Sequence, residues 1–216
     1  MPNHRPGFAG GARSSPRWPA EAARLSACAS RVRGLVPTVC AMKKLAAKNL
    51  GRVLDLLHER LAFERAGVKL YDTILPRMRS SGDPGVQGML EGLQHNRDEE
   101  KAHEEWLEDQ IRALGGDDHA PSEKSILVTA ESEGIEQVIL RDPNLLHDLH
   151  ALLTAELADN AGWDLLVQLA AEFGDRDAKK EFKKRLHEEE EHLVLVRKAV
   201  MELSKQEMRE SFVEPA

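Results

Sequence analysis

Apolar residues recur every three or four positions in four separate stretches of this sequence. The first stretch comprises Leu50, Leu54, Leu57, Leu61, Val68 and Leu75. Residues three, four or seven apart share one face of an α-helix, so this pattern predicts a helix that buries one stripe against its neighbours. The other three stretches run over residues 89–114, 145–170 and 182–203. The sequence therefore predicts an all-α fold with four long helices.

Turn signals separate the first two predicted helices. Pro76 is expected to kink or end the first helix, and "SSGDPG" (80–85) is typical of a turn. Asp83 and Pro84 then supply an N-cap and a first-turn proline for the second helix. Gly115-Gly116 predicts its end.

The second half of the chain repeats these signals after a longer connection over residues 117–142, in which "TAESEGIEQVIL" (129–140) predicts a short helix. Asp142-Pro143 predicts the start of the third helix. "EFGDRD" (172–177) predicts the turn into a fourth helix that begins near Ala178. Two tight turns and a long crossover between helices two and three indicate an antiparallel four-helix bundle.

The composition divides the chain at residue 41. Residues 1–41 are rich in Pro, Gly, Ser, Ala and Arg, with six Arg and one acidic residue, and they predict a disordered basic tail. Translated upstream codons and a transit peptide remain alternative explanations of this tail. Residues 42–216, with a charge balance of −12, form the predicted bundle.

The composition also argues against several classes of function. An acidic body disfavours nucleic acid as a partner, because binding to phosphates needs a basic face. No apolar run is long enough to predict a membrane span. Both cysteines, Cys28 and Cys40, fall in the tail, so the body offers no disulfide or cysteine metal site. No secretory signal is evident, and we predict a cytoplasmic protein.

Six polar residues occupy positions on the apolar stripes. Glu100 and His103 lie between Leu93 and Leu107, and a second Glu-x-x-His pair, Glu189 and His192, has the same setting in the fourth helix. Glu64 and Glu156 lie on the stripes of the first and third helices. Two Glu-x-x-His matches alone are weak evidence in a chain this rich in glutamate.

The spacings make chance an unsatisfactory explanation. Glu64 and Glu156 are 92 residues apart, as are Tyr71 and Trp163. An offset of 89 residues separates three further pairs, which are Glu99 and Glu188, Glu100 and Glu189, and His103 and His192. The body therefore consists of two similar helix pairs that each supply the same set of side chains.

The energetics of burial favour a metal site. Four bare carboxylates in one core would repel each other and lose hydration at a cost of several kcal/mol each. Two divalent cations would balance four glutamates and two neutral imidazoles. Ligands rich in oxygen, with one nitrogen for each metal, suit iron or manganese. Two metals bridged by carboxylates usually lie about 3.5–4 Å apart.

At these residues the chain resembles the ferritin-like di-iron carboxylate superfamily, which includes ferritins, bacterioferritins and rubrerythrins. The resemblance spans about residues 43–205. It implies that Glu64 and Glu156 are terminal ligands, Glu100 and Glu189 are bridging ligands, and His103 and His192 are nitrogen ligands. It further implies that Glu99 orients His192 and that Glu188 orients His103. Tyr71, a candidate catalytic residue, would hydrogen-bond a glutamate across the bundle, with Trp163 as its counterpart.

Departures from the family pattern narrow the expected cofactors. Lys101 stands where bacterioferritins carry the methionine that binds haem, so no haem is expected. The chain lacks the Cys-x-x-Cys pairs of a rubredoxin domain, and Leu153 replaces an extra glutamate of rubrerythrins.

Three functions remain open at this point. The resemblance implies two iron ions and oxidation of Fe(II) by dioxygen or hydrogen peroxide. An oxidase or peroxidase that uses iron or manganese on another substrate is an alternative, as is a bundle that metal merely stabilises. A homo-oligomer is expected if the chain forms a storage cage.

Overall fold

The computed structural model describes residues 40–141 and 143–211, and these residues form an all-α structure. Its helices are α1 (Lys43–Ser80), α2 (Pro84–Gln87), α3 (Leu90–Ala113), α4 (Glu123–Arg141), α5 (Leu145–Glu172) and α6 (Arg176–Ser211). The predicted tail, residues 1–41, lies outside the described residues except for its last two positions. No helix among the described residues is long and apolar enough to cross a membrane.

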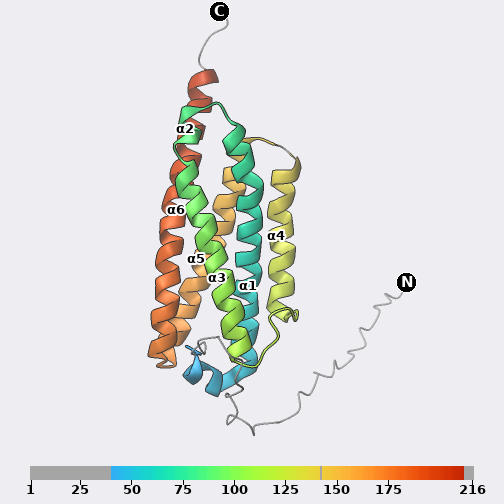
Figure 1. Cartoon of the computed structure of the whole chain (residues 1–216), viewed down its shortest axis with the longest axis vertical. Helices are drawn as coiled ribbons and strands as arrows, with labels where there is room; N and C mark the ends of the chain where they lie inside the picture. Colours follow the sequence, from blue (N-terminus) through green and yellow to red (C-terminus); the bar gives the residue numbers. More distant parts are fainter. Residues whose placement is uncertain (1–39, 142, 212–216) are drawn as a thin grey trace, which may run out of the picture. The chain divides into compact units, whose positions relative to one another are not determined.

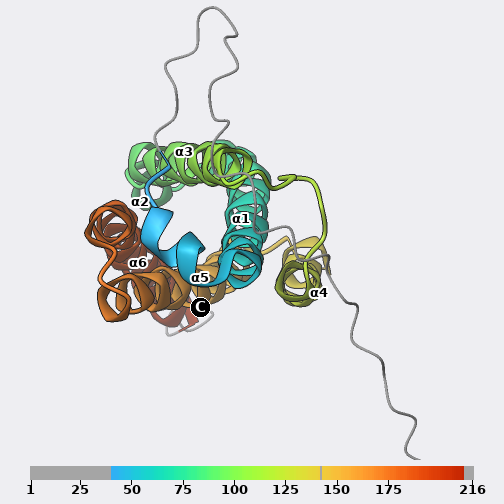
Figure 2. The same ribbon diagram turned by 90° about the horizontal axis from the view of Figure 1, so that it is seen from below.

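Four of the helices form an antiparallel bundle (Figure 1). Helix α1 packs against α3 and α5, and α6 packs against the same two helices. The crossover between α3 and α5 contains α4, which runs along the outside of the bundle against α1 and α5 (Figure 2). The predicted four-helix bundle with one long crossover is thus confirmed, although the crossover helix is longer than expected.

The start of α1 covers one end of the bundle. Asn49 has non-helical torsion angles (φ −159°, ψ 87°), so the first turns of α1 bend across the base of the bundle (Figure 2). The carboxylate of Asp175, before α6, accepts hydrogen bonds from the backbone N–H groups of Lys44 and Leu45 at 2.9 and 3.0 Å. The side chain of Met42 is fully buried there.

Several predicted boundaries differ from the observed ones. Helix α1 continues past Pro76 to Ser80, because a proline removes only one backbone hydrogen bond and Met78 is anchored in the core. Asp83 caps α2 as predicted, but the backbone interrupts the expected second helix before α3 begins at Leu90. The cap of α5 is Asn144, whose side chain accepts from the N–H groups of Leu146 and His147.

The interior divides into two apolar clusters. The first lies toward Met78, Leu93 and Val196, and the second lies toward Leu57, Leu107 and Phe182. On each of α1, α3, α5 and α6, the predicted polar residues lie between a residue of one cluster and a residue of the other. The middle of the bundle is therefore a polar layer enclosed by apolar packing.

Candidate metal centre

The six predicted ligands meet in this polar layer. Each of the four bundle helices contributes to it, and no residue in the set is more than 2% exposed. The residues are Glu64 from α1, Glu100 and His103 from α3, Glu156 from α5, and Glu189 and His192 from α6. Burial of four carboxylates at one place requires compensation by positive charge.

The side chains fall into two overlapping groups whose oxygen and nitrogen atoms converge within 4.8 Å. One group contains Glu64, His103 and Glu189, and the other contains Glu100, Glu156, Glu189 and His192. Glu189 belongs to both groups, and Glu100 also converges with Glu64 and Glu189. Glu100 and Glu189 are therefore each shared between groups of converging side chains.

The distances between facing atoms suit ligands around a shared ion. His103 Nδ1 lies 3.3 Å from Glu64 Oε2 and 3.0 Å from Glu189 Oε1. His192 Nδ1 lies 3.3 Å from Glu189 Oε2 and 3.6 Å from Glu156 Oε2. Two ligand atoms that are each about 2.1 Å from one ion, and at right angles to each other, stand about 3.0 Å apart.

The atoms that face the centre of the layer have no hydrogen-bond partner among the described residues. They are Glu64 Oε2, Glu100 Oε2, His103 Nδ1, Glu156 Oε2, both carboxylate oxygens of Glu189, and His192 Nδ1. Buried polar atoms are nearly always satisfied in folded proteins. The concentration of unpaired acceptors at one point therefore fits a site for cations, and the donor set fits two divalent ions.

The electrostatics of the layer point in the same direction. Burial raises the pKa of Glu100 well above its ordinary value, and the carboxylates of Glu189 and Glu156 raise it further. Burial would also raise the pKa of Glu189, but the adjacent imidazoles of His103 and His192 outweigh it and lower this pKa to about 2. Burial alone would lower the pKa of His103 and His192. The surrounding acids outweigh this effect and raise the pKa of both histidines. The layer thus attracts positive charge.

The outer nitrogens of the two histidines contact acids on opposite helices. His103 Nε2 lies 3.0 Å from Glu188 Oε2, and His192 Nε2 lies 3.0 Å from Glu99 Oε2. Each contact orients an imidazole so that Nδ1 faces the centre, which is the arrangement that supports a metal-binding histidine. In the structure, Glu99 thus contacts His192, and Glu188 contacts His103.

Tyr71 contacts Glu156, and Trp163 contacts Glu64. The phenol of Tyr71 donates to Glu156 Oε1 at 2.5 Å, and the indole N–H of Trp163 donates to Glu64 Oε1 at 2.8 Å. Both side chains are fully buried. Asn96 also donates to the oxygen of Tyr71, at 3.1 Å, and fixes the direction of its hydroxyl proton.

Sequence reasoning missed a buried ion pair next to the layer. Asp159 pairs with Arg60, and the oxygens of Asp159, Glu64, Glu100 and Glu189 also converge within 4.8 Å. Asp159 Oδ2 has no hydrogen-bond partner among the described residues. The three-residue spacing from Glu156 places both acids on one face of α5 and could have revealed Asp159, although not its pairing with Arg60.

Comparisons with known proteins support the fold. No protein-family model and no curated protein sequence match this chain. A solved structure from Bacillus anthracis strain Ames, described as a ferritin-like, diiron-carboxylate protein, matches with a TM-score of 0.53. The match covers 69% of this chain and 95% of that chain, at 13% sequence identity. The chain therefore has the ferritin-like fold.

Proposed function

We propose that this protein binds two iron ions in the polar layer and oxidises Fe(II) with dioxygen or hydrogen peroxide. The convergence of unpaired, buried ligand atoms from four helices carries this proposal. When bound, two Fe(II) ions each supply one electron, and hydrogen peroxide with two protons is reduced to two water molecules. Dioxygen with two protons would give hydrogen peroxide by the same transfer.

The residues of the chain would hold and orient the two ions. Glu64 and His103 would hold one ion, Glu156 and His192 the other, and Glu100 and Glu189 would contact both. Tyr71 and Trp163 each keep one oxygen of a terminal glutamate engaged, so the second oxygen remains directed at its ion. Tyr71 also places a phenol proton beside the site, where it is available to the reaction.

An anaerobic titration tests the binding step. We expect saturation near two Fe(II) per chain, and loss of this binding in Glu189→Gln because Glu189 belongs to both groups. Glu190→Gln is the matched control, since its side chain is 62% exposed on the same helix. Equal binding by the two variants would contradict the proposal.

A stabilising metal site without chemistry is the second candidate, because the layer would demand cations in either case. Stopped-flow absorbance after ferrous protein is mixed with oxygen or peroxide distinguishes the two functions. Elemental analysis of protein from its native host decides between iron and manganese. A cytoplasmic location and a homo-oligomer also remain predictions, and light scattering tests whether a cage forms.

A further inference from the structure

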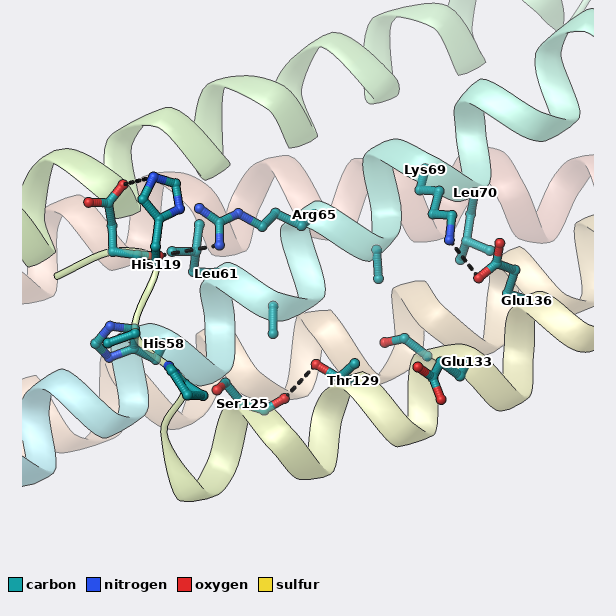
Figure 3. A pocket seen from close by; sticks show the side chains of 16 residues that line it. His58, Leu61, Arg65, Lys69, Leu70, His119, Ser125, Thr129, Glu133 and Glu136 are labelled. Atoms are coloured by element: carbon teal, nitrogen blue, oxygen red, sulfur yellow. Dashed lines mark hydrogen bonds and ion pairs between the residues drawn. The ribbon is translucent and has the colours of Figure 1, made fainter.

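A pocket with several charged residues in its walls lies between α1 and α4. It has a volume of about 380 Å³, and its walls come from α1, α4 and the loop that precedes α4. Figure 3 shows Lys69 of α1 reaching Glu136 of α4 across this pocket, and their charged atoms are 2.8 Å apart. Arg65 and Glu133 also line it. We call it the outer pocket.

A second, much smaller cavity is lined by residues of α1, α3, α4 and α5. Its volume is about 10 Å³, and Glu100, Glu156 and Asp159 are among its lining residues. A volume of about 10–15 Å³ is the least that admits one water molecule. This inner cavity therefore leads to the polar layer but has room only for a molecule of about that size.

The outer pocket and the inner cavity share three wall residues, Ala66, Leu70 and Ser132. The two spaces are therefore adjacent, and the shared side chains lie between them. Gly67, in the wall of the inner cavity, lies close to the predicted ligand Glu100. At Gly67 an added Cβ would lie 2.5 Å from Glu100 Oε2, which leaves no space for a side chain there.

Apart from its three acidic residues, the inner cavity has mostly apolar walls. Phe63, Leu70, Ile135 and Ala155 are apolar, and a hydrated cation would have to shed water against them at a cost of several kcal/mol. Ser132 is the exception, because its buried hydroxyl oxygen has no hydrogen-bond partner among the described residues. A small uncharged molecule that can accept or donate one hydrogen bond matches this lining.

We propose that the boundary between α1 and α4 is the route by which the oxidant, dioxygen or hydrogen peroxide, reaches the metal centre. This inference rests on the proposed function. The outer pocket admits the molecule from solvent, and the connection at Ala66 and Ser132 limits its size. The oxidant then meets Glu100 and Glu156, two of the predicted ligands that line the inner cavity.

Narrowing the connection tests this route. Ala66→Leu adds three carbon atoms where the outer pocket and the inner cavity meet. Ala161→Leu makes the same change on an exposed position of α5 and is the matched control. Each variant is first loaded anaerobically with Fe(II), and the rate of oxidation is then measured by stopped flow against the concentration of dioxygen and, separately, of hydrogen peroxide.

We expect Ala66→Leu to bind two Fe(II) per chain but to oxidise them about tenfold more slowly, as when a barrier rises by about 1.4 kcal/mol. The control should match the wild type. A slowdown with only one of the two oxidants identifies the one that uses the route. Unchanged rates with both oxidants would overturn the route, whereas absence of oxidation in the loaded wild type would overturn the proposed function instead.

A widened passage gives an independent test should Ala66→Leu fold or load poorly. Ile135→Ala removes bulk from the α4 wall of the inner cavity without touching any predicted ligand. We expect this variant to react with tert-butyl hydroperoxide at least about tenfold faster than the wild type, while its rate with hydrogen peroxide changes little. No gain with the bulky oxidant would contradict the route.

Discussion

The indole N–H of Trp163 on α5 donates to Oε1 of Glu64 on α1, at 2.8 Å across 99 residues of sequence. In the opposite direction, the phenol of Tyr71 on α1 donates to Oε1 of Glu156 on α5, at 2.5 Å. In both glutamates the second oxygen, Oε2, faces the centre without a partner among the described residues. The two aromatic donors thus determine which oxygen of Glu64 and of Glu156 faces the centre.

The first prediction concerns this donor role. Trp163→Phe keeps an aromatic ring but leaves a buried oxygen of Glu64 unpaired, which should destabilise the fold by about 1–3 kcal/mol. Because such supporting contacts tune ligand geometry, affinity for Fe(II) should fall about 10–100-fold. Urea unfolding and anaerobic titration measure the two effects.

Trp106→Phe provides the control for this prediction. Trp106 packs beneath the guanidinium of Arg185, and its ring lies near that of Trp163 without contacting a predicted ligand. The control should therefore keep the affinity of the wild type for Fe(II). If both variants bind Fe(II) equally well, the indole N–H has no role in holding Glu64.

The second prediction concerns a substitution that should stabilise the metal-free protein but weaken metal binding. Glu100 is buried and its pKa is raised well above the ordinary value, so its ionised form destabilises the fold above the ordinary pKa when no cation is bound. Glu100→Gln should therefore raise the free energy of unfolding of the metal-free protein by about 1–3 kcal/mol. The same change should weaken metal binding, because Glu100 is a predicted bridge.

Thermal unfolding with and without Fe(II) under anaerobic conditions measures both effects. Metal should raise the melting temperature of the wild type more than that of Glu100→Gln, since only binding to the folded state is stabilising. Glu105→Gln, on an exposed position of the same helix, should behave as the wild type. A metal-free Glu100→Gln variant that is less stable than the wild type would refute the prediction.

The third prediction concerns the ion pair that the sequence analysis missed. Arg60 and Asp159 are both nearly fully buried, and Arg60 also donates to the backbone oxygen of Asp159 at 2.9 Å. Arg60→Met leaves the carboxylate buried and uncompensated, which should cost about 3–5 kcal/mol of stability. Arg52→Met removes an exposed ion pair of the same helix and should cost at most about 1 kcal/mol.

A steric variant tests the same pair without altering its charges. A Cβ at Gly162 would lie 1.9 Å from the Arg60 guanidinium carbon, so Gly162→Ala must displace this group. We expect a loss of stability even though alanine favours helices more than glycine does. Circular dichroism during urea unfolding measures the change, and a more stable Gly162→Ala variant would contradict the packing described here.

Local patterns predict the bundle and the polar layer better than they predict the contacts around it. Positions on the apolar stripes, together with the equal spacings of 92 and 89 residues, identify all six side chains that meet in the polar layer. These signals work because helical periodicity fixes which face a residue occupies. The contact of Arg60 with Asp159 joins residues 99 positions apart, and no local pattern encodes it.

Local patterns also failed to predict the length of the crossover helix. Its helix was expected to be short, yet α4 extends over Glu123–Arg141, because packing against α1 and α5 stabilises turns that sequence propensity leaves undecided. The bend at Asn49 was also missed, since it depends on the distant carboxylate of Asp175. Tertiary contacts thus decide where these helices begin and how they dock.

The last prediction concerns the attachment of α4 to α1. Asp55 Oδ1 accepts from the backbone N–H of Lys124 at 3.2 Å, in the first turn of α4. Burial raises the pKa of Asp55, but this hydrogen bond, one from Ser122, and the hydrogen bond and charge of Arg52 together outweigh it, and the net pKa lies below the ordinary value of an aspartate. The ionised carboxylate therefore stabilises the fold above that value, and this stabilisation is lost as the pH falls through the lowered pKa.

Asp55→Asn should thus be less stable than the wild type by about 1 kcal/mol at neutral pH, the usual effect of losing such a contact at a helix start. The difference should shrink toward zero as the pH falls through the lowered pKa of Asp55, where the folded wild-type carboxylate gains its proton. Urea unfolding over a pH series measures it. Asp98→Asn, whose side chain is 60% exposed, should show little difference throughout. If the difference in the free energy of unfolding between wild type and Asp55→Asn stays constant as the pH falls, the charge of Asp55 does not stabilise the packing of α4 on α1.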